Sequence, residues 1–167
     1  MLTEGVAAGH DGVIYFSDIT RTFDCTDARG AQAGHIWRYD PASDACRIFR
    51  SPSGMANGLA FDAAGDLVAV EGADHGGRRV TRTDMATGRA FIVATGYGGR
   101  PFNAPNDVWI DLAGRLWVTD PRYFGHEPVW VASGSMRRTA PWPPPSRCRC
   151  CRPMSSSAAT TRCVVPR

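Results

Sequence analysis

The body of the chain repeats itself at a fixed interval, and this repeat constrains the fold more than any other feature. The segment NGLAFD at 57–62 aligns with NDVWID at 106–111, and AGDLVAVEG at 64–72 aligns with AGRLWVTDP at 113–121, both at an offset of 49 residues. Two equal offsets over segments of this length indicate one structural unit that occurs more than once, as in solenoids and propellers.

Each repeat unit has the pattern of short strands joined by turns. In the second unit, strands are expected at 57–62, 66–71, 79–84 and 89–95. Gly65, Gly88 and Gly114 stand where tight turns need a positive φ. Short strands without helical periodicity, at a period near 50 residues, predict an all-β fold built of propeller blades. A sandwich or barrel with coincidental similarity between its parts is the alternative.

Further copies of the repeat unit stand before and after the second unit. DGVIYFSD at 11–18 follows EGVAAG at 4–9, and IWRYDPASDACRIF at 36–49 aligns with VTRTDMATGRAFIV at 80–93 at an offset of 44 residues. The first unit is nearly complete and the third has its first two strands, which gives about two and a half blades. Because an open array leaves a free sheet edge, we expect self-association through the open blade edges.

Residues 129–167 differ sharply in composition from residues 1–128. The first part has 12 Arg and 16 Asp or Glu, whereas the second has seven Arg, no acidic residue and many Pro, Ser and Cys. The tail is either disordered and basic, a composition typical of contacts with nucleic acid or membranes, or a non-native sequence from a shifted reading frame of GC-rich DNA. We favour the shifted frame, with the break near Val129, and expect no nucleic-acid or membrane partner.

The N-terminal segment does not have the pattern of a secretory signal. MLTEGVAAGHDG has neither the basic n-region nor the apolar h-region of a secretory signal. No run in the sequence approaches the roughly 18 apolar residues of a membrane span. A cytoplasmic location is therefore expected.

Polar side chains recur where the innermost strand of each unit begins. Glu4, Asn57 and Asn106 take equivalent positions in the three units. The first strand of a blade lines the central channel of a propeller, so these side chains should converge on one axis. One carboxylate and two amides suit Ca²⁺ or a similar divalent ion. Capping of turns or binding of water is an equally open interpretation.

The same residues resemble a known family. SPSGMANGLAFDAAGDLVAVE and, above all, NAPNDVWIDLAGRLWVTDPRYFG resemble the gluconolactonase/regucalcin-type (senescence marker protein) family, over about Thr3 to Pro128. That family consists of six-bladed propeller lactonases, which are related in fold to luciferin-regenerating enzymes and diisopropyl fluorophosphatase. The resemblance implies that this chain corresponds to the N-terminal half of such a propeller, followed by an irregular tail.

The resemblance also implies one catalytic divalent ion, Ca²⁺ or Zn²⁺, at the channel mouth. Glu4 in EG takes the place of the first family ligand, and Asn106 in PND takes the place of an asparagine that binds metal in some members and contacts substrate in others. Other side chains would line the substrate pocket beside the metal. These implied substrate-binding residues are Asn57, Asn103, Asp107 and Asp120.

The implied activity is metal-dependent hydrolysis of a small sugar-type lactone in carbohydrate catabolism. Ala104 stands where regucalcin-like members have an arginine that grips the sugar acid. The Asn and Asp that complete the family's metal site and transfer the proton would lie beyond Pro128, where the sequence has neither residue type. The catalytic residue is therefore unassigned and activity is expected to be impaired. A non-catalytic propeller fragment and an organophosphate-like ester hydrolase are the alternatives.

Other polar and aromatic residues support further expectations. Glu71 follows the second strand of the second unit, where it would either contact the pocket or belong to a solvated loop. Trp37, Trp109 and Trp117 fall on expected strands, which predicts that they pack between blades.

Overall fold

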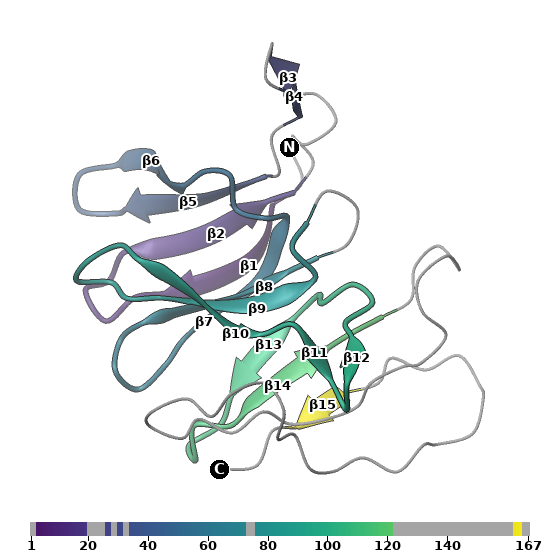
Figure 1. The fold of residues 1–167 in the computed structure, drawn as a ribbon. Helices are drawn as coiled ribbons and strands as arrows, with labels where there is room; N and C mark the ends of the chain where they lie inside the picture. The colour runs from purple at the N-terminus through teal and green to yellow at the C-terminus, as the bar shows by residue number, and fades with distance from the viewer. Residues whose placement is uncertain are drawn as a thin grey trace.

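The computed structural model consists of strands, turns and loops. It describes residues 3–19, 26–27, 30–31, 34–72, 76–121 and 162–164. None of these residues lies in a helix, so no described segment is a helix that could cross a membrane. The described strands pair in antiparallel sheets (Figure 1), which confirms the predicted all-β class.

The first blade is a complete four-stranded sheet. Its strands, in spatial order, are β1 (Thr3–Ala8), β2 (Ile14–Asp18), β5 (His35–Asp40) and β6 (Ala45–Arg50). A short ribbon of β3 (Thr26–Asp27) and β4 (Gly30–Ala31) is inserted between β2 and β5 along the chain. The unit that the sequence predicted as nearly complete therefore has all of its strands.

The second blade is also a four-stranded sheet, and its strands lie side by side in the order in which they occur along the chain. They are β7 (Ala56–Phe61), β8 (Leu67–Glu71), β9 (Arg79–Thr83) and β10 (Ala90–Ala94). Each agrees with the expected strand to within one residue at either end, which confirms the prediction for this unit. A second short ribbon follows, formed by β11 (Gly96–Tyr97) and β12 (Arg100–Pro101).

The third blade begins as the repeat predicts. The expected first two strands are β13 (Val108–Ile110) and β14 (Leu116–Thr119), and β15 (Arg162–Val164) pairs with β14 on its other side. β15 belongs to the segment 129–167, whose remaining residues lie outside the described part of the chain. A non-native or disordered tail over that segment therefore remains a prediction.

The sequence repeat is preserved in the pairing of the strands. Residues 49 apart occupy the same register in β7–β8 and in β13–β14. The corresponding pairs are Leu59–Ala69 and Val108–Val118, Ala60–Val68 and Trp109–Trp117, and Phe61–Leu67 and Ile110–Leu116. Because a slip of one residue would turn every side chain to the other face, the offset also predicts which face of each blade a residue occupies.

A repeated aspartate fixes the turn between the first two strands of a blade. Asp62 Oδ1 accepts hydrogen bonds from the backbone N–H groups two and four residues later, at 2.8 and 3.1 Å, and Asp111 does the same at 2.9 Å for both. Gly65 and Gly114 complete these turns with φ of 82° and 72°, as predicted. Desolvation opposes ionisation of Asp111, but hydrogen bonds from the backbone and guanidinium of Arg115 outweigh it and lower its pKa to about 2.

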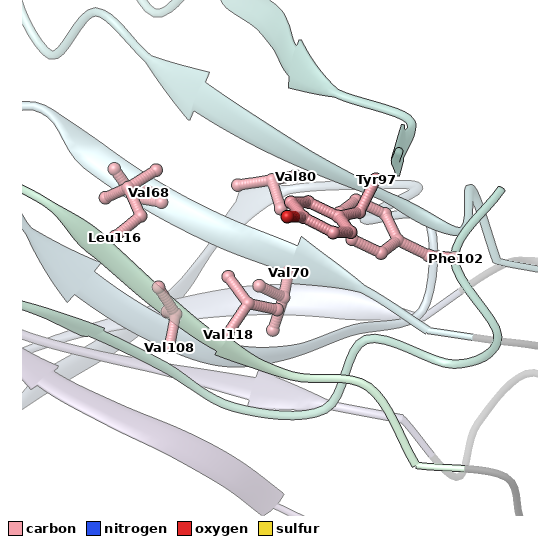
Figure 2. Packing of buried hydrophobic residues seen from close by; sticks show 8 residues of the cluster. All are labelled: Val68, Val70, Val80, Tyr97, Phe102, Val108, Leu116 and Val118. Carbon is pink, nitrogen blue, oxygen red and sulfur yellow. The ribbon is translucent and has the colours of Figure 1, made fainter. Parts of the chain in front are cut away.

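Two hydrophobic clusters hold the blades together. One lies between the first and second blades and includes Tyr15, Leu59 and Leu67. The other lies between the second and third blades and is shown in Figure 2. Its buried members are Val68, Val70, Val80, Tyr97, Phe102, Val108, Leu116 and Val118. Both faces of the second blade are therefore apolar and covered, as alternation along its strands requires.

The three tryptophans do not all pack between blades. Trp109 is 61% exposed, whereas Trp37 and Trp117 are half-buried. Trp109 and Trp117 face each other across β13 and β14, with ring centroids 6.3 Å apart, on the side of the third blade that points away from the second. The prediction was therefore wrong for Trp109 and Trp117, because a strand pattern does not show whether a neighbouring blade covers that side.

Removal of the Phe102 ring tests the packing between the second and third blades. Phe102 is fully buried, so Phe102→Ala should lower the free energy of unfolding by about 3–5 kcal/mol through lost burial and a residual cavity. Urea unfolding followed by circular dichroism measures this change. Phe91→Ala removes a ring that is 50% exposed and should cost less than about 1 kcal/mol. Similar losses in the two variants would contradict the assignment of Phe102 to the core.

Candidate functional site

The inner strand β7 contacts both β1 and β13. A Cβ on Gly5 would lie 1.9 Å from the backbone oxygen of Asn57, and a Cβ on Gly58 would lie 2.6 Å from the Cα of Asp107. The Gly58 N–H donates a 2.7 Å hydrogen bond to the backbone oxygen of Asn106. Only residues without a Cβ permit this approach. The strand heads that are equivalent in the sequence therefore meet in space.

Glu4 and Asn57 lie at matching irregularities of β1 and β7. The register of β1 with β2 shifts between Glu4 and Ala7, and that of β7 with β8 shifts between Ala56 and Leu59. Such shifts re-aim side chains and are common beside functional sites. Both Glu4 and Asn57 are half-buried, so their polar groups keep access to solvent at the strand heads.

Asn106 and Asp107 are held at the head of β13 by the end of β14. Asn106 N–H donates to the backbone oxygen of Thr119 at 2.9 Å, and Thr119 N–H donates to the backbone oxygen of Asp107 at 3.0 Å. The Asp107 N–H donates to Thr119 Oγ1 at 2.9 Å. The Asn106 side chain is half-buried and the Asp107 side chain is exposed, and Asp107 Oδ1 accepts the Val108 N–H at 2.8 Å.

Asn103 and Asp120 are fully buried and bind each other. The two carboxylate oxygens of Asp120 accept the Asn103 N–H at 2.9 and 3.0 Å, and Oδ1 accepts the Ala104 N–H at 2.8 Å. The Asn103 Nδ2 donates to Asp120 Oδ2 at 3.2 Å. Burial raises the pKa of Asp120, against the opposing effect of the backbone N–H groups of Asn103 and Ala104. This pair fixes the loop that leads to Asn106, and a direct contact with substrate remains a prediction.

The strand heads offer oxygen donors to a divalent ion. Glu4 supplies a carboxylate, and Asn57 and Asn106 supply amide oxygens, which suit Ca²⁺ better than Zn²⁺ with its preference for nitrogen and sulfur. Within the described ranges, no group of three or more His, Cys, Asp or Glu side chains is arranged to hold a metal. Three such donors are fewer than the roughly six to eight oxygens of a calcium shell, and metal binding by them remains a prediction.

Glu71 does not lie in a solvated loop, so that prediction is wrong. Its side chain is fully buried and forms ion pairs with Arg50 at 2.5 Å and Arg79 at 2.6 Å. Its Oε1 also accepts the Thr81 hydroxyl at 3.1 Å. Arg50 is the last residue of β6, so this cluster joins the first blade to the second.

Glu71 is one of three buried acids at equivalent positions. Asp18, Glu71 and Asp120 stand at the end of the second strand of each blade, and their exposed fractions are 1%, 0% and 0%. Asp120 holds Asn103, and a Cβ on the equivalent Gly54 would lie 2.3 Å from Glu71 Oε2. The recurring acid in YFSD, VAVE and WVTD is the sequence signal that could have identified these positions.

These observations define a partial β-propeller whose inner-strand heads carry oxygen donors. Residues 2–142 match the family described as SMP-30/Gluconolactonase/LRE-like region. The chain therefore belongs to this family, as its resemblance predicted. The match continues past Pro128, where the resemblance in the sequence was expected to end.

Individual relatives agree with this assignment. The gluconolactonase of Zymomonas mobilis subsp. mobilis is 33% identical over 75 residues, which are 45% of this chain and 20% of that protein. A solved gluconolactonase from Xanthomonas campestris is 28% identical with a TM-score of 0.58, over 71% of this chain and 35% of that chain. A luciferin-regenerating enzyme shares the fold, with 20% identity and a TM-score of 0.55, over 71% of this chain and 39% of that chain. This chain thus spans less than half the length of these relatives.

Replacement of Asp120 tests its hold on the loop before β13. Asp120→Asn should lower the free energy of unfolding by about 1–3 kcal/mol, because an amide nitrogen replaces an oxygen that accepts N–H groups. Urea unfolding measures the change. Asp107→Asn alters an exposed carboxylate and keeps one acceptor oxygen, so it should change the free energy by less than about 0.5 kcal/mol. Equal changes in the free energy of unfolding for Asp120→Asn and Asp107→Asn would refute a structural role for Asp120.

Replacement of Glu71 tests the link between the first two blades. Glu71→Gln should lower the free energy of unfolding by about 3 kcal/mol. This is at the low end for a broken buried ion pair, because Arg50 and Arg79 retain some solvent contact. Thermal unfolding with a parallel urea titration measures this cost. Asp44→Asn changes an exposed carboxylate in a turn and serves as the control. A loss below about 1 kcal/mol for Glu71→Gln would show that the ion pairs do not join the blades.

Proposed function

We propose that this chain carries the N-terminal part of a site for metal-dependent hydrolysis of a small sugar-type lactone. Membership of the gluconolactonase-like family supports the reaction class. The observation that carries the proposal is the contact between the heads of β1, β7 and β13, which gathers Glu4, Asn57 and Asn106 at one end of the inner strands.

The proposal gives each polar residue a distinct role. Glu4 and Asn106 would hold the divalent ion, which when bound would polarise the lactone carbonyl and make an attacking water more acidic. Asn57 and Asp107, at the same strand heads, would contact the substrate hydroxyl groups. Further from the ligand, buried side chains would shape the pocket by fixing the loop before β13. These are Asn103 and Asp120.

We also propose that turnover by this chain is impaired. Hydrolysis of a lactone needs a group that takes a proton from the attacking water. The sequence has no Asp or Glu after Glu127, so a carboxylate from a later blade is not supplied by this chain. This observation favours, as the second candidate, a chain that binds metal without catalysing the reaction.

Metal binding can be measured separately from activity. Isothermal titration of the chelator-treated chain with Ca²⁺ and with Zn²⁺ should show one site, with Ca²⁺ preferred for an all-oxygen donor set. Glu4→Gln and Asn106→Ala should each weaken binding by at least about tenfold, a loss of roughly 1.4 kcal/mol. Asp11→Asn, in the turn at the other end of the first blade, should leave binding unchanged. Unaltered affinity in both ligand variants would refute the assignment.

Activity assays distinguish the proposed function from its alternatives. Hydrolysis of a sugar δ-lactone, followed by acid release and corrected for the spontaneous rate, should depend on added metal and stop with chelator. Metal binding without turnover would favour the non-catalytic fragment. Turnover of an organophosphate ester but not of the lactone would favour the ester hydrolase. Lactone turnover at equal rates with and without metal would refute the metal-dependent mechanism.

A further inference from the structure

Arg78 has a backbone conformation that its side chain makes unfavourable. It directly precedes β9 and has a φ of 46°, in the left-handed region that residues with a long side chain rarely adopt. Gly34 precedes β5, the equivalent strand of the first blade, in the same way and has a φ of 71°. The second blade therefore has an arginine where the first blade has a glycine. Backbone strain of this kind is concentrated at functional sites.

Arg78 lies beside the loops that enter two inner strands. Its N–H donates to the backbone oxygen of Gly72 at 3.1 Å, and the Gly72 N–H donates at 3.0 Å to the backbone oxygen of Met55, the residue before β7. The Arg78 Nη1 donates to the backbone oxygen of Asn103 at 2.7 Å, three residues before Asn106. The half-buried guanidinium is therefore held at the entry to β13, next to the candidate site.

The charge of the Arg78 guanidinium is not neutralised by a direct ion pair. Among the residues that the structure describes, its one side-chain hydrogen bond is the bond to Asn103, although a guanidinium has five N–H donors. The neighbouring Arg79 is instead paired with Glu71. Burial raises the pKa of Asp120, and Arg78 is among the groups that oppose this rise, but both Asp120 oxygens already accept N–H groups of the loop. The remaining donors of Arg78 suit an anionic group of a ligand.

We propose that Arg78 binds a carboxylate, so that the substrate class of the site is a sugar lactone that carries a carboxylate group. A guanidinium and a carboxylate can form two parallel, charge-assisted hydrogen bonds. A phosphate, with a charge of about −2, would call for a second cation, whereas Arg50 and Arg79 are already bound to Glu71. The lactone in this proposal rests on the proposed function, but recognition of a carboxylate by Arg78 does not.

D-Glucuronate and D-glucose test the proposal, because they share one ring and differ by a carboxylate in place of a hydroxymethyl group. An NMR titration of the chelator-treated 167-residue chain at low ionic strength should show tighter binding of glucuronate. Arg78→Gly should weaken glucuronate binding by at least about tenfold and glucose binding by less than about twofold. Since glycine adopts a φ of 46° without steric cost, the urea midpoint of this variant should not fall.

Two further variants separate the geometry of the guanidinium from its charge. Arg78→Lys keeps the charge and the strained backbone but loses the planar fork, so it should retain part of the preference for glucuronate. Arg47→Gln removes one positive charge from an exposed position on β6 of the first blade and should leave glucuronate binding unchanged.

Several results would overturn the proposal. These are equal binding of the two sugars by the wild-type chain, binding of neither sugar, and unchanged glucuronate binding in Arg78→Gly. Loss of the cooperative unfolding transition in Arg78→Gly would assign Arg78 a structural role instead. Inorganic phosphate that binds more tightly than glucuronate would exclude a site specific for carboxylate. These titrations contain no metal and measure no turnover, so carboxylate binding and the proposed function fail separately.

Discussion

A carboxylate buried at the end of the second strand of each blade is the constraint on which the described structure depends. A buried charge is costly unless it is paired and hydrogen-bonded, so each acid requires donors from segments distant in the sequence. Glu71 meets the guanidinium groups of Arg50 and Arg79, and Asp120 meets the backbone and amide N–H groups of Asn103. In the third blade, the acid thereby fixes the loop that enters the inner strand, whereas in the second blade Glu71 holds Arg50, the residue from which that loop starts.

The candidate site follows from this arrangement and from two glycines. Gly5 and Gly58 let the inner strands approach so closely that a side chain at either position would overlap the neighbouring backbone. Glu4, Asn57 and Asn106 consequently lie at neighbouring strand heads, at one end of the blades.

The repeat predicted the strands of the second blade to within one residue and, through equal offsets, their pairing register in the third. It did not predict the environment of Glu71, because alternation along a strand does not show that Arg50, on another blade, reaches the same point. Nor did the repeat show that Trp109 is exposed. A strand that can be covered on both faces has the same sequence pattern whether or not a neighbouring blade covers it. The repeat also did not predict that the backbone and side-chain N–H groups of Asn103 bind Asp120, and the contact of Asn103 with substrate remains a prediction.

By itself, the sequence determined the all-β class, the blade period, the turn aspartates and the equivalence of the strand heads, because each depends on local pattern and spacing. It also carried the family resemblance that the match over residues 2–142 confirms. Only the tertiary structure decided which polar residues are buried against one another, which strand heads touch and which aromatic faces remain open. Those properties depend on contacts between segments far apart in the chain, and such contacts form only when the blades pack.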